Sequence, residues 1–173
     1  MNYAQLRHFD VANGPGVRAS IFVSGCRFNC KGCFNKEAQD FNYGNKFDKE
    51  TEDKFMEYIK DDNVKGVSIL GGEPLMQTMD DSLLNLLKRI KKESNKEIWM
   101  WTGFVYETAI LDEKRKEILD YVDVLVDGQF DESKKVLNLK FRGSTNQRII
   151  DLNKTKLENI IEFKEGGIYE VIG

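Results

Sequence analysis

The sequence predicts an α/β fold in which parallel strands alternate with helices in a partial, open (β/α) barrel, formed as a single domain over residues 1–173. Two observations lead to this prediction. Short apolar segments alternate along the chain with longer segments whose apolar residues recur at helical spacing, which is typical of parallel βαβ units. The chain has 173 residues, whereas a complete eightfold barrel needs about 250. We therefore expect fewer strands than a closed barrel requires.

Four segments are predicted to be buried strands, because they are short, apolar and rich in β-branched residues, and each ends at a glycine. These segments are ASIFVSG at 19–25, GVSILGG at 66–72, EIWMWTG at 97–103 and VDVLVDG at 122–128.

The segments between these strands are predicted to be helices. Asp48 is placed to cap the first, over 48–62, whose apolar residues share one face: Phe55, Met56 and Ile59. The second covers 80–94, with leucine and isoleucine at helical spacing: Leu83, Leu84, Leu87 and Ile90. The third segment, 106–122, is predicted to be mostly helical.

The C-terminal part of the chain, about 153–173, is predicted to be an extension of the domain. Within it, NIIEFKEGGIYEVIG at 159–173 has two apolar segments around a pair of glycines. This pattern favours a hairpin that turns at Gly166 and Gly167.

Charge and hydropathy exclude two classes of partner. The 26 basic and 29 acidic side chains leave a net charge of only −3, which does not favour bulk binding to nucleic acid. The first 16 residues contain no long apolar stretch, and no later segment approaches the ~20 apolar residues of a membrane span. Because the thiols are also clustered, we expect the protein to work in a reducing cytoplasm.

All four predicted strands lead into polar or glycine-rich segments. The first is followed by a cysteine-rich loop, and the others by GGEPL, WTGF and DGQF. In parallel α/β folds the C-terminal ends of the strands share one rim, and this rim carries the active site. We therefore expect these four loops to form the functional site.

The first of these loops contains every cysteine of the chain: Cys26, Cys30 and Cys33. Thiolates are soft ligands that suit zinc, copper(I) or iron–sulfur clusters. A zinc site would need His8, far upstream, as its fourth ligand, and a thioredoxin-like pair of Cys30 and Cys33 would leave Cys26 unexplained. A cubic cluster held by three thiolates, with one iron left open for a substrate, accounts for the number three.

These motifs resemble those of a known superfamily. The CxxxCxxC pattern with an aromatic residue, Phe34, beside its last cysteine resembles the radical S-adenosylmethionine (SAM) enzymes, and NGPGVRASIFVSGC resembles the N-terminal signature of the activating enzymes of glycyl radical enzymes. GGEPL, WMWTGF, VLVDGQF and RGSTNQRIID together resemble the branch that activates anaerobic (class III) ribonucleoside-triphosphate reductase. The resemblance covers roughly residues 2–152.

The resemblance implies a barrel of the radical SAM type and a defined chemistry. Three cysteines would bind a [4Fe-4S] cluster, and SAM would chelate the fourth iron. Reductive cleavage of SAM would give a 5′-deoxyadenosyl radical that removes hydrogen from a glycine of the large reductase subunit. A low-potential donor such as flavodoxin or ferredoxin would supply the electron. No residue is expected to act as an acid, base or nucleophile, because cluster and SAM carry the chemistry.

The resemblance also implies a SAM site on the rim. Glu73 is expected to meet the ammonium group of SAM, and Arg142 its carboxylate; the alternatives are a solvated turn residue for Glu73 and a partner or solvent contact for Arg142. For Asp127, a role as a turn residue before Gly128 is as strong an interpretation as a role in the SAM site. The complete predicted set is Phe34, Asn35, Gly71, Gly72, Glu73, Thr102, Asp127 and Arg142.

Four charged or titratable residues near the N-terminus are interpreted separately. Arg27, Lys31 and Lys36 make the cysteine loop basic, which suits an acidic electron donor, although solvated surface charge explains them nearly as well. His8 is expected to be structural. Two other functions remain open at this stage: a radical SAM enzyme acting on another glycyl radical enzyme or on a small molecule, and a non-enzymatic zinc or redox module.

Overall fold

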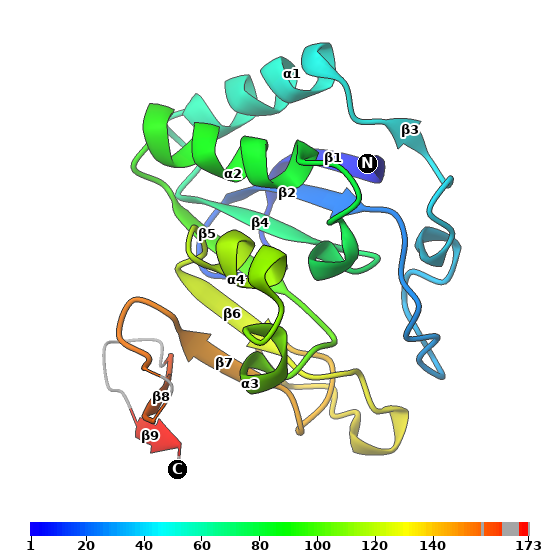
Figure 1. Cartoon of the computed structure of the whole chain (residues 1–173), viewed down its shortest axis with the longest axis vertical. Coiled ribbons are helices and arrows are strands. Elements are labelled where there is room, and N and C mark those ends of the chain that lie inside the picture. The colour runs from blue at the N-terminus through cyan, green and yellow to red at the C-terminus, as the bar shows by residue number, and fades with distance from the viewer. Residues whose placement is uncertain (157, 164–169, 173) are drawn as a thin grey trace.

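The computed structural model describes residues 1–156, 158–163 and 170–172 (Figure 1). In this part of the chain nine strands form one mixed sheet in the order β3-β1-β2-β4-β5-β6-β7-β8-β9. The strands are β1 (Asn2–Asp10), β2 (Arg18–Val23), β3 (Asn45–Lys46), β4 (Gly66–Gly71), β5 (Glu97–Trp101), β6 (Val124–Asp127), β7 (Arg148–Asp151), β8 (Ile160–Glu162) and β9 (Glu170–Ile172).

The four predicted strands are confirmed as β2, β4, β5 and β6, and they pair in parallel in this order. Each ends one or two residues before its predicted end, because the glycine or polar residue that closes each motif lies outside the ladder. One row of apolar residues crosses all four strands and is buried: Ile21, Ile69, Met100 and Leu125.

The expectation of a parallel sheet is wrong outside this centre. β1 pairs antiparallel with β2, and β7 pairs antiparallel with β6, so most strand pairings of the described sheet are antiparallel. β1 was not predicted because it is largely half-buried and mixes polar with apolar residues. The fold is therefore α/β with a mixed sheet, and the partial barrel remains a prediction.

The predicted helices are confirmed with adjusted bounds as α1 (Lys49–Lys60), α2 (Ser82–Glu93), and the two short helices α3 (Tyr106–Ala109) and α4 (Glu113–Leu119). The Asp48 carboxylate caps α1 by accepting a hydrogen bond from the Thr51 N–H (2.9 Å). Asp112 caps α4 by accepting from the Arg115 N–H (3.0 Å), which explains why the predicted third helix is interrupted. Short 3-10 turns follow three of the loops: η1 (Glu37–Gln39), η2 (Pro74–Met76) and η3 (Glu132–Lys134).

The helices pack their apolar faces on one side of the sheet, where they form the main core with strand residues (Figure 1). The predicted face of α1 is confirmed. In α2 the prediction was wrong at one position, because Leu86 is buried and Leu84 is only half-buried. The buried α2 residues are therefore Leu83, Leu86, Leu87 and Ile90.

The C-terminal segment adds two strands to the sheet. β8 and β9 pair antiparallel, with Ile160 opposite Ile172. Gly166 and Gly167, where the hairpin was predicted to turn, lie outside the described residues, and the single-domain assignment stays a prediction. Among the described helices, none has the length and apolar character needed to cross a membrane.

Candidate metal centre and adjoining cavity

The loops that follow the four parallel strands meet at one edge of the sheet, on the right of Figure 1. Backbone hydrogen bonds join them: Gly72 N–H donates to the Val23 carbonyl (2.7 Å) and Glu73 N–H to the Gly25 carbonyl (2.9 Å). On the other side, Gly128 N–H donates to the Phe104 carbonyl (2.9 Å). The rim is thus a connected structure.

The cysteine loop leaves β2 and is held at its base by the segment that follows it. Gly25 N–H donates to the Ala38 carbonyl (2.8 Å), and Cys26 N–H donates to the Gln39 carbonyl (3.0 Å). Beyond this base, Cys30 and Cys33 are linked by a turn in which the Cys33 N–H donates to the Cys30 carbonyl (3.2 Å). All three thiols are partly exposed and free of disulfide bonds.

The pKa of the Cys26 thiol depends on its burial and on neighbouring charged groups. Burial raises the pKa of the Cys26 thiol; a backbone hydrogen bond from Phe28 opposes this, and the charges of Glu73, Cys30 and Cys33 add to it. Thiolates at these three positions therefore repel one another. A cation shared by them would reverse the repulsion and favour the ligating thiolate form.

The donor set fits an iron–sulfur cluster in its chemistry, because one partly exposed loop supplies three unpaired soft ligands. Among the described residues, no three Cys, His, Asp or Glu side chains are already gathered around a common metal position. The loop therefore brings the thiols into one segment without assembling them.

His8 lies on β1, away from the cysteine loop in sequence and in its contacts. Its ring stacks on those of Phe9 and Tyr58, with centroids 3.9 and 4.5 Å away, and its Nε2 lies 3.0 Å from an Asp61 carboxylate oxygen. These contacts give the imidazole a structural role. They provide no support for a zinc site completed by His8.

Gly71 and Gly72 are needed by the packing of the rim itself. Gly71 has a φ of +114°, and a Cβ there would lie 2.6 Å from the backbone of Val23. A Cβ on Gly72 would lie 2.7 Å from the Ala38 carbonyl oxygen. Both glycines belong to the predicted SAM site, and the close approach seen here is to β2 and the cysteine loop.

Glu73 is buried, with 1% of its surface exposed, and its carboxylate points toward the loop after β5. One oxygen accepts hydrogen bonds from the Thr102 hydroxyl (2.7 Å) and the Leu75 N–H (2.9 Å), and the other accepts from the Gly103 N–H (2.7 Å). Burial raises the pKa of Glu73 to about 7, although these three donors and the charge of Arg115 act in the opposite direction. Thr102 is also buried, and it was predicted as a separate site residue.

Asp127 is buried at the end of β6 and is fully engaged by the protein. Its carboxylate accepts hydrogen bonds from the Tyr106 N–H (2.8 Å) and from Nε (3.0 Å) and Nη2 of Arg148. Arg148 also makes a two-point contact with Glu107, at 3.0 and 2.7 Å. Arg148 was missed as a site residue because β7, which places it opposite Asp127, was not predicted.

The RGSTNQ segment, which precedes β7, is organised by Gln147. The Gln147 side chain accepts from the Gly143 N–H (2.7 Å) and donates to the Gly128 carbonyl (2.9 Å), so it fastens this turn to the loop after β6. Arg142 donates to the Gln147 carbonyl (2.7 Å) and lies 4.0 Å from Glu162. These partners place Arg142 beside β8.

A cavity of about 820 Å³ opens between the cysteine loop and the loop after β6. This volume lies in the range of small-molecule and cofactor sites. Of the predicted site residues, Cys30 and Asp127 line it. The lining also includes Asn29, Lys31, Val105, Gly128, Gln129, Phe130, Asp131, Glu132, Ser133, Asn146 and Arg148.

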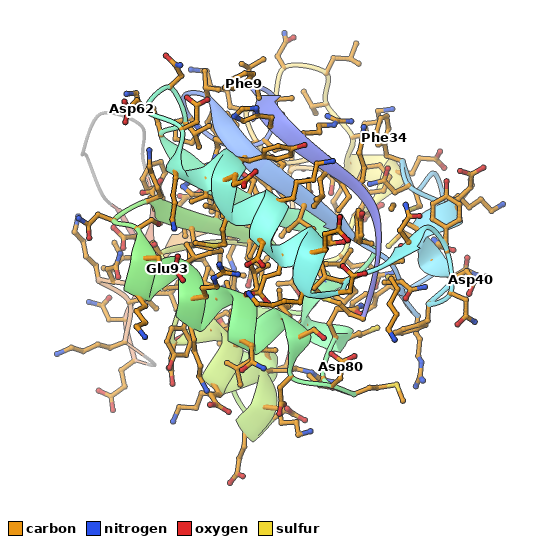
Figure 2. All side chains as sticks on the ribbon, turned by 90° about the horizontal axis from the view of Figure 1, so that it is seen from above. Phe9, Phe34, Asp40, Asp62, Asp80 and Glu93 are labelled. Carbon is orange, nitrogen blue, oxygen red and sulfur yellow. The ribbon has the colours of Figure 1, made fainter. Side chains whose placement is uncertain are left out.

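The remaining predicted residues lie elsewhere on the rim. Phe34 is 94% exposed and projects from the cysteine-loop side of the molecule (Figure 2), and Asn35 beside it is half-buried. Glu73 and Thr102 lie together under the rim. The structure thus brings together Glu73 with Thr102, and Cys30 with Asp127, while Phe34 and Arg142 stand apart.

Comparison with known proteins shows the class of protein to which this chain belongs. A family model described as a 4Fe-4S single cluster domain matches residues 12–150, which include the three cysteines and all four rim loops. The chain is therefore a member of this iron–sulfur family.

Comparison with individual similar proteins identifies a family within this class. The chain is 43% identical over 152 residues to the anaerobic ribonucleoside-triphosphate reductase-activating protein of Vibrio cholerae, covering 86% of this chain and 97% of the relative. The protein of the same name from Escherichia coli K12 is 41% identical over 85% of this chain and 96% of its own length. That of enterobacteria phage T4 is 35% identical over 86% and 93%. The chain belongs to the family of anaerobic ribonucleoside-triphosphate reductase-activating proteins.

Proposed function

We propose that this protein is a radical SAM enzyme that activates an anaerobic ribonucleoside-triphosphate reductase. The observation that carries the proposal is the loop with Cys26, Cys30 and Cys33, in a chain that matches reductase-activating proteins over most of its length. When bound, the reduced [4Fe-4S] cluster would supply the electron that cleaves SAM to methionine and a 5′-deoxyadenosyl radical, which takes hydrogen from a glycine of the reductase.

The chain's own residues would bind, orient and shield the reactants. Three thiolates would hold three irons, so the amino and carboxylate groups of SAM can bind the fourth. The rim and the partial barrel predicted around it would form the SAM site. The residues assigned to this site are Phe34, Asn35, Gly71, Gly72, Glu73, Thr102, Asp127 and Arg142.

The cavity beside Cys30 supports a SAM site next to the cysteine loop, and Asp127 is the assigned residue that lines it. Its volume of about 820 Å³ is large enough for a nucleoside-bearing ligand, and it lies directly against the cysteine loop. Polar side chains line it on the side of Asp127 and Arg148. A docked reductase would cover the open side and exclude water and stray hydrogen donors.

The cysteine loop would also receive the electron. Arg27, Lys31 and Lys36 give this loop a positive charge in a chain whose net charge is −3. An acidic, low-potential protein such as flavodoxin or ferredoxin has the complementary charge. We place the reaction in the reducing cytoplasm, with no membrane or nucleic-acid partner.

The proposal is tested on the wild-type chain purified without oxygen. The protein should be brown and contain about four irons per chain, the stoichiometry of a cubic cluster. With dithionite and SAM it should form methionine and 5′-deoxyadenosine in equal amounts. A colourless protein containing zinc would contradict the proposal. If the protein turned over a small molecule and left the reductase unchanged, the small molecule would take the place of the reductase as the proposed substrate.

A further inference from the structure

The side chain of Glu73 connects two neighbouring rim loops. It belongs to the GGEP loop after β4, and its carboxylate reaches the loop after β5, where it accepts from the Thr102 hydroxyl (2.7 Å) and the Gly103 N–H (2.7 Å). The same carboxylate accepts from the Leu75 N–H in its own loop (2.9 Å). Glu73 and Thr102 are 1% and 4% exposed.

This arrangement leaves the carboxylate no open surface for a ligand. A carboxylate has about four acceptor positions; three of those of Glu73 are taken by donors inside the protein, and the residue is 1% exposed. We propose that Glu73 is a positioning residue, which with Thr102 braces the GGEP loop, and that it supports SAM binding without touching SAM. This inference rests on the proposed function.

The brace also reaches the cysteine loop. The Glu73 N–H donates to the Gly25 carbonyl (2.9 Å), and the Gln77 side chain donates to the same carbonyl (3.3 Å) and to the Glu73 carbonyl (3.1 Å). Gly25 directly precedes Cys26. Residues 73–77 therefore lie between the first cysteine and the loop after β5, so a displaced Glu73 changes both sides of the rim.

Substitution of Thr102 distinguishes the brace from direct binding of SAM by Glu73. Thr102→Val removes the hydroxyl donor with little change in size and leaves the Glu73 carboxylate in place. If Glu73 bound SAM directly, E73Q would weaken SAM affinity, and T102V would do so only through a contact of its own, so that the two losses would add. The brace requires both variants to weaken SAM binding, roughly ten- to a hundredfold, as is typical when residues that support a site are changed.

The losses of SAM affinity caused by E73Q and T102V should not add. Both substitutions disrupt the hydrogen bonds between Glu73 and the loop after β5. The double variant should therefore have a SAM affinity no lower than that of the single variant with the lower affinity. Thr102→Ser keeps the hydroxyl and should restore affinity to within about threefold of wild type on the same scale. Thr108→Val is the matched control, since the Thr108 hydroxyl donates to the Val105 carbonyl (2.8 Å) at an exposed position.

The experiment is a titration of each cluster-loaded full-length variant with SAM, followed by the electron paramagnetic resonance (EPR) signal of the reduced cluster, with iron content measured alongside. Loss of affinity in E73Q with wild-type affinity in T102V would overturn the brace. Failure of the wild-type protein to bind SAM would instead overturn the proposed function, so the two failures are distinguishable.

A second measurement needs no variant and decides the question if T102V fails to fold or to hold iron. Hydrogen exchange of the Leu75 and Gly103 amides is measured in the cluster-loaded wild-type protein with and without SAM. The brace predicts that both amides stay protected when SAM is bound, because the carboxylate keeps its partners. Faster exchange at either amide on SAM binding would show that Glu73 leaves the brace for the ligand, and would overturn the inference.

Discussion

The two ends of the parallel strands differ in how completely their polar groups are buried and hydrogen-bonded. At the amino end the Arg18 side chain is 1% exposed, and it forms four hydrogen bonds and an ion pair with Glu97. At the carboxyl end Glu73 and Asp127 are also buried, but three thiols are partly exposed, and one of them, Cys30, lines a cavity. In Figure 2, Asp62 and Glu93 lie toward the first end, and Phe34 and Asp40 toward the second. One end supports the fold, and the other is left available for a ligand.

The amino end shows what a completed polar network requires. Burial lowers the pKa of Arg18 to about 10, while the charge and hydrogen bond of Glu97 oppose this shift. Its guanidinium lies 5.4 Å from the centre of the Trp99 ring. Gly14 and Gly66 leave room for it, since a Cβ on either would lie within 2.8 Å of the Arg18 side chain. Part of the NGPGVR signature is thus explained by packing.

The largest expected effect concerns the carboxyl end. Replacing Cys26, Cys30 or Cys33 by alanine should abolish the cluster that binds SAM, because only three thiols are available to hold three irons. Iron analysis and EPR of the reduced proteins measure this. His8→Ala is the control and should keep its iron. A His8→Ala protein that loses its metal while a cysteine variant keeps it would reverse the assignment.

The next effect concerns the amino end. Arg18→Met should lower the free energy of unfolding by about 3 kcal/mol, the low end of the range for a broken buried ion pair, because Glu97 retains contact with water. Denaturant unfolding of the cluster-free chain measures this. SAM affinity of the folded, cluster-loaded fraction should stay near that of wild type. A stable variant that has lost SAM binding would show that the two ends are not separate.

A smaller effect links a glycine to this network. Gly66→Ala places a Cβ 2.5 Å from the Arg18 guanidinium, so the free energy of unfolding should fall by about 1–3 kcal/mol. The penalty should largely disappear in the Arg18→Met background, where the crowded group is absent. Denaturant unfolding of the two single variants and the double variant gives the coupling. An unchanged penalty in the double variant would locate the strain elsewhere.

The smallest effect on stability is expected at the surface of the cysteine loop. Lys31 lies 3.3 Å from Glu132, but its side chain is 90% exposed, so Lys31→Ala should change the free energy of unfolding by less than about 1 kcal/mol. Cluster reduction by an acidic flavodoxin should slow several-fold at low salt, with a smaller difference at high salt. Equal rates at every salt concentration would exclude this lysine from donor binding.

The sequence was sufficient for the centre of the fold. The four parallel strands, the Asp48 cap and the buried face of α1 follow from local patterns of apolar and capping residues. β1 and β7 escaped prediction because neither has a continuous apolar pattern, and their places depend on pairing with distant strands.

The candidate site residues differ in how far local sequence patterns point to them. The three cysteines stand out from their spacing as candidate metal ligands, because metal ligation demands particular residue types. Arg148 could not be found, because its place opposite Asp127 exists only once β7 is paired. The burial of Glu73 against Thr102 also depends on two loops 29 residues apart. Sequence patterns therefore identified the loops of the rim, and the structure was needed to show which side chains face one another.

The central claim is tested most directly by adding the reduced, cluster-loaded protein and SAM to its cognate anaerobic reductase without oxygen. We expect a stable glycyl radical on the reductase by EPR spectroscopy, together with methionine and 5′-deoxyadenosine, and none of these with Cys30→Ala. A reductase that remains free of radical while the wild-type protein cleaves SAM would contradict the assignment of the reductase as its substrate.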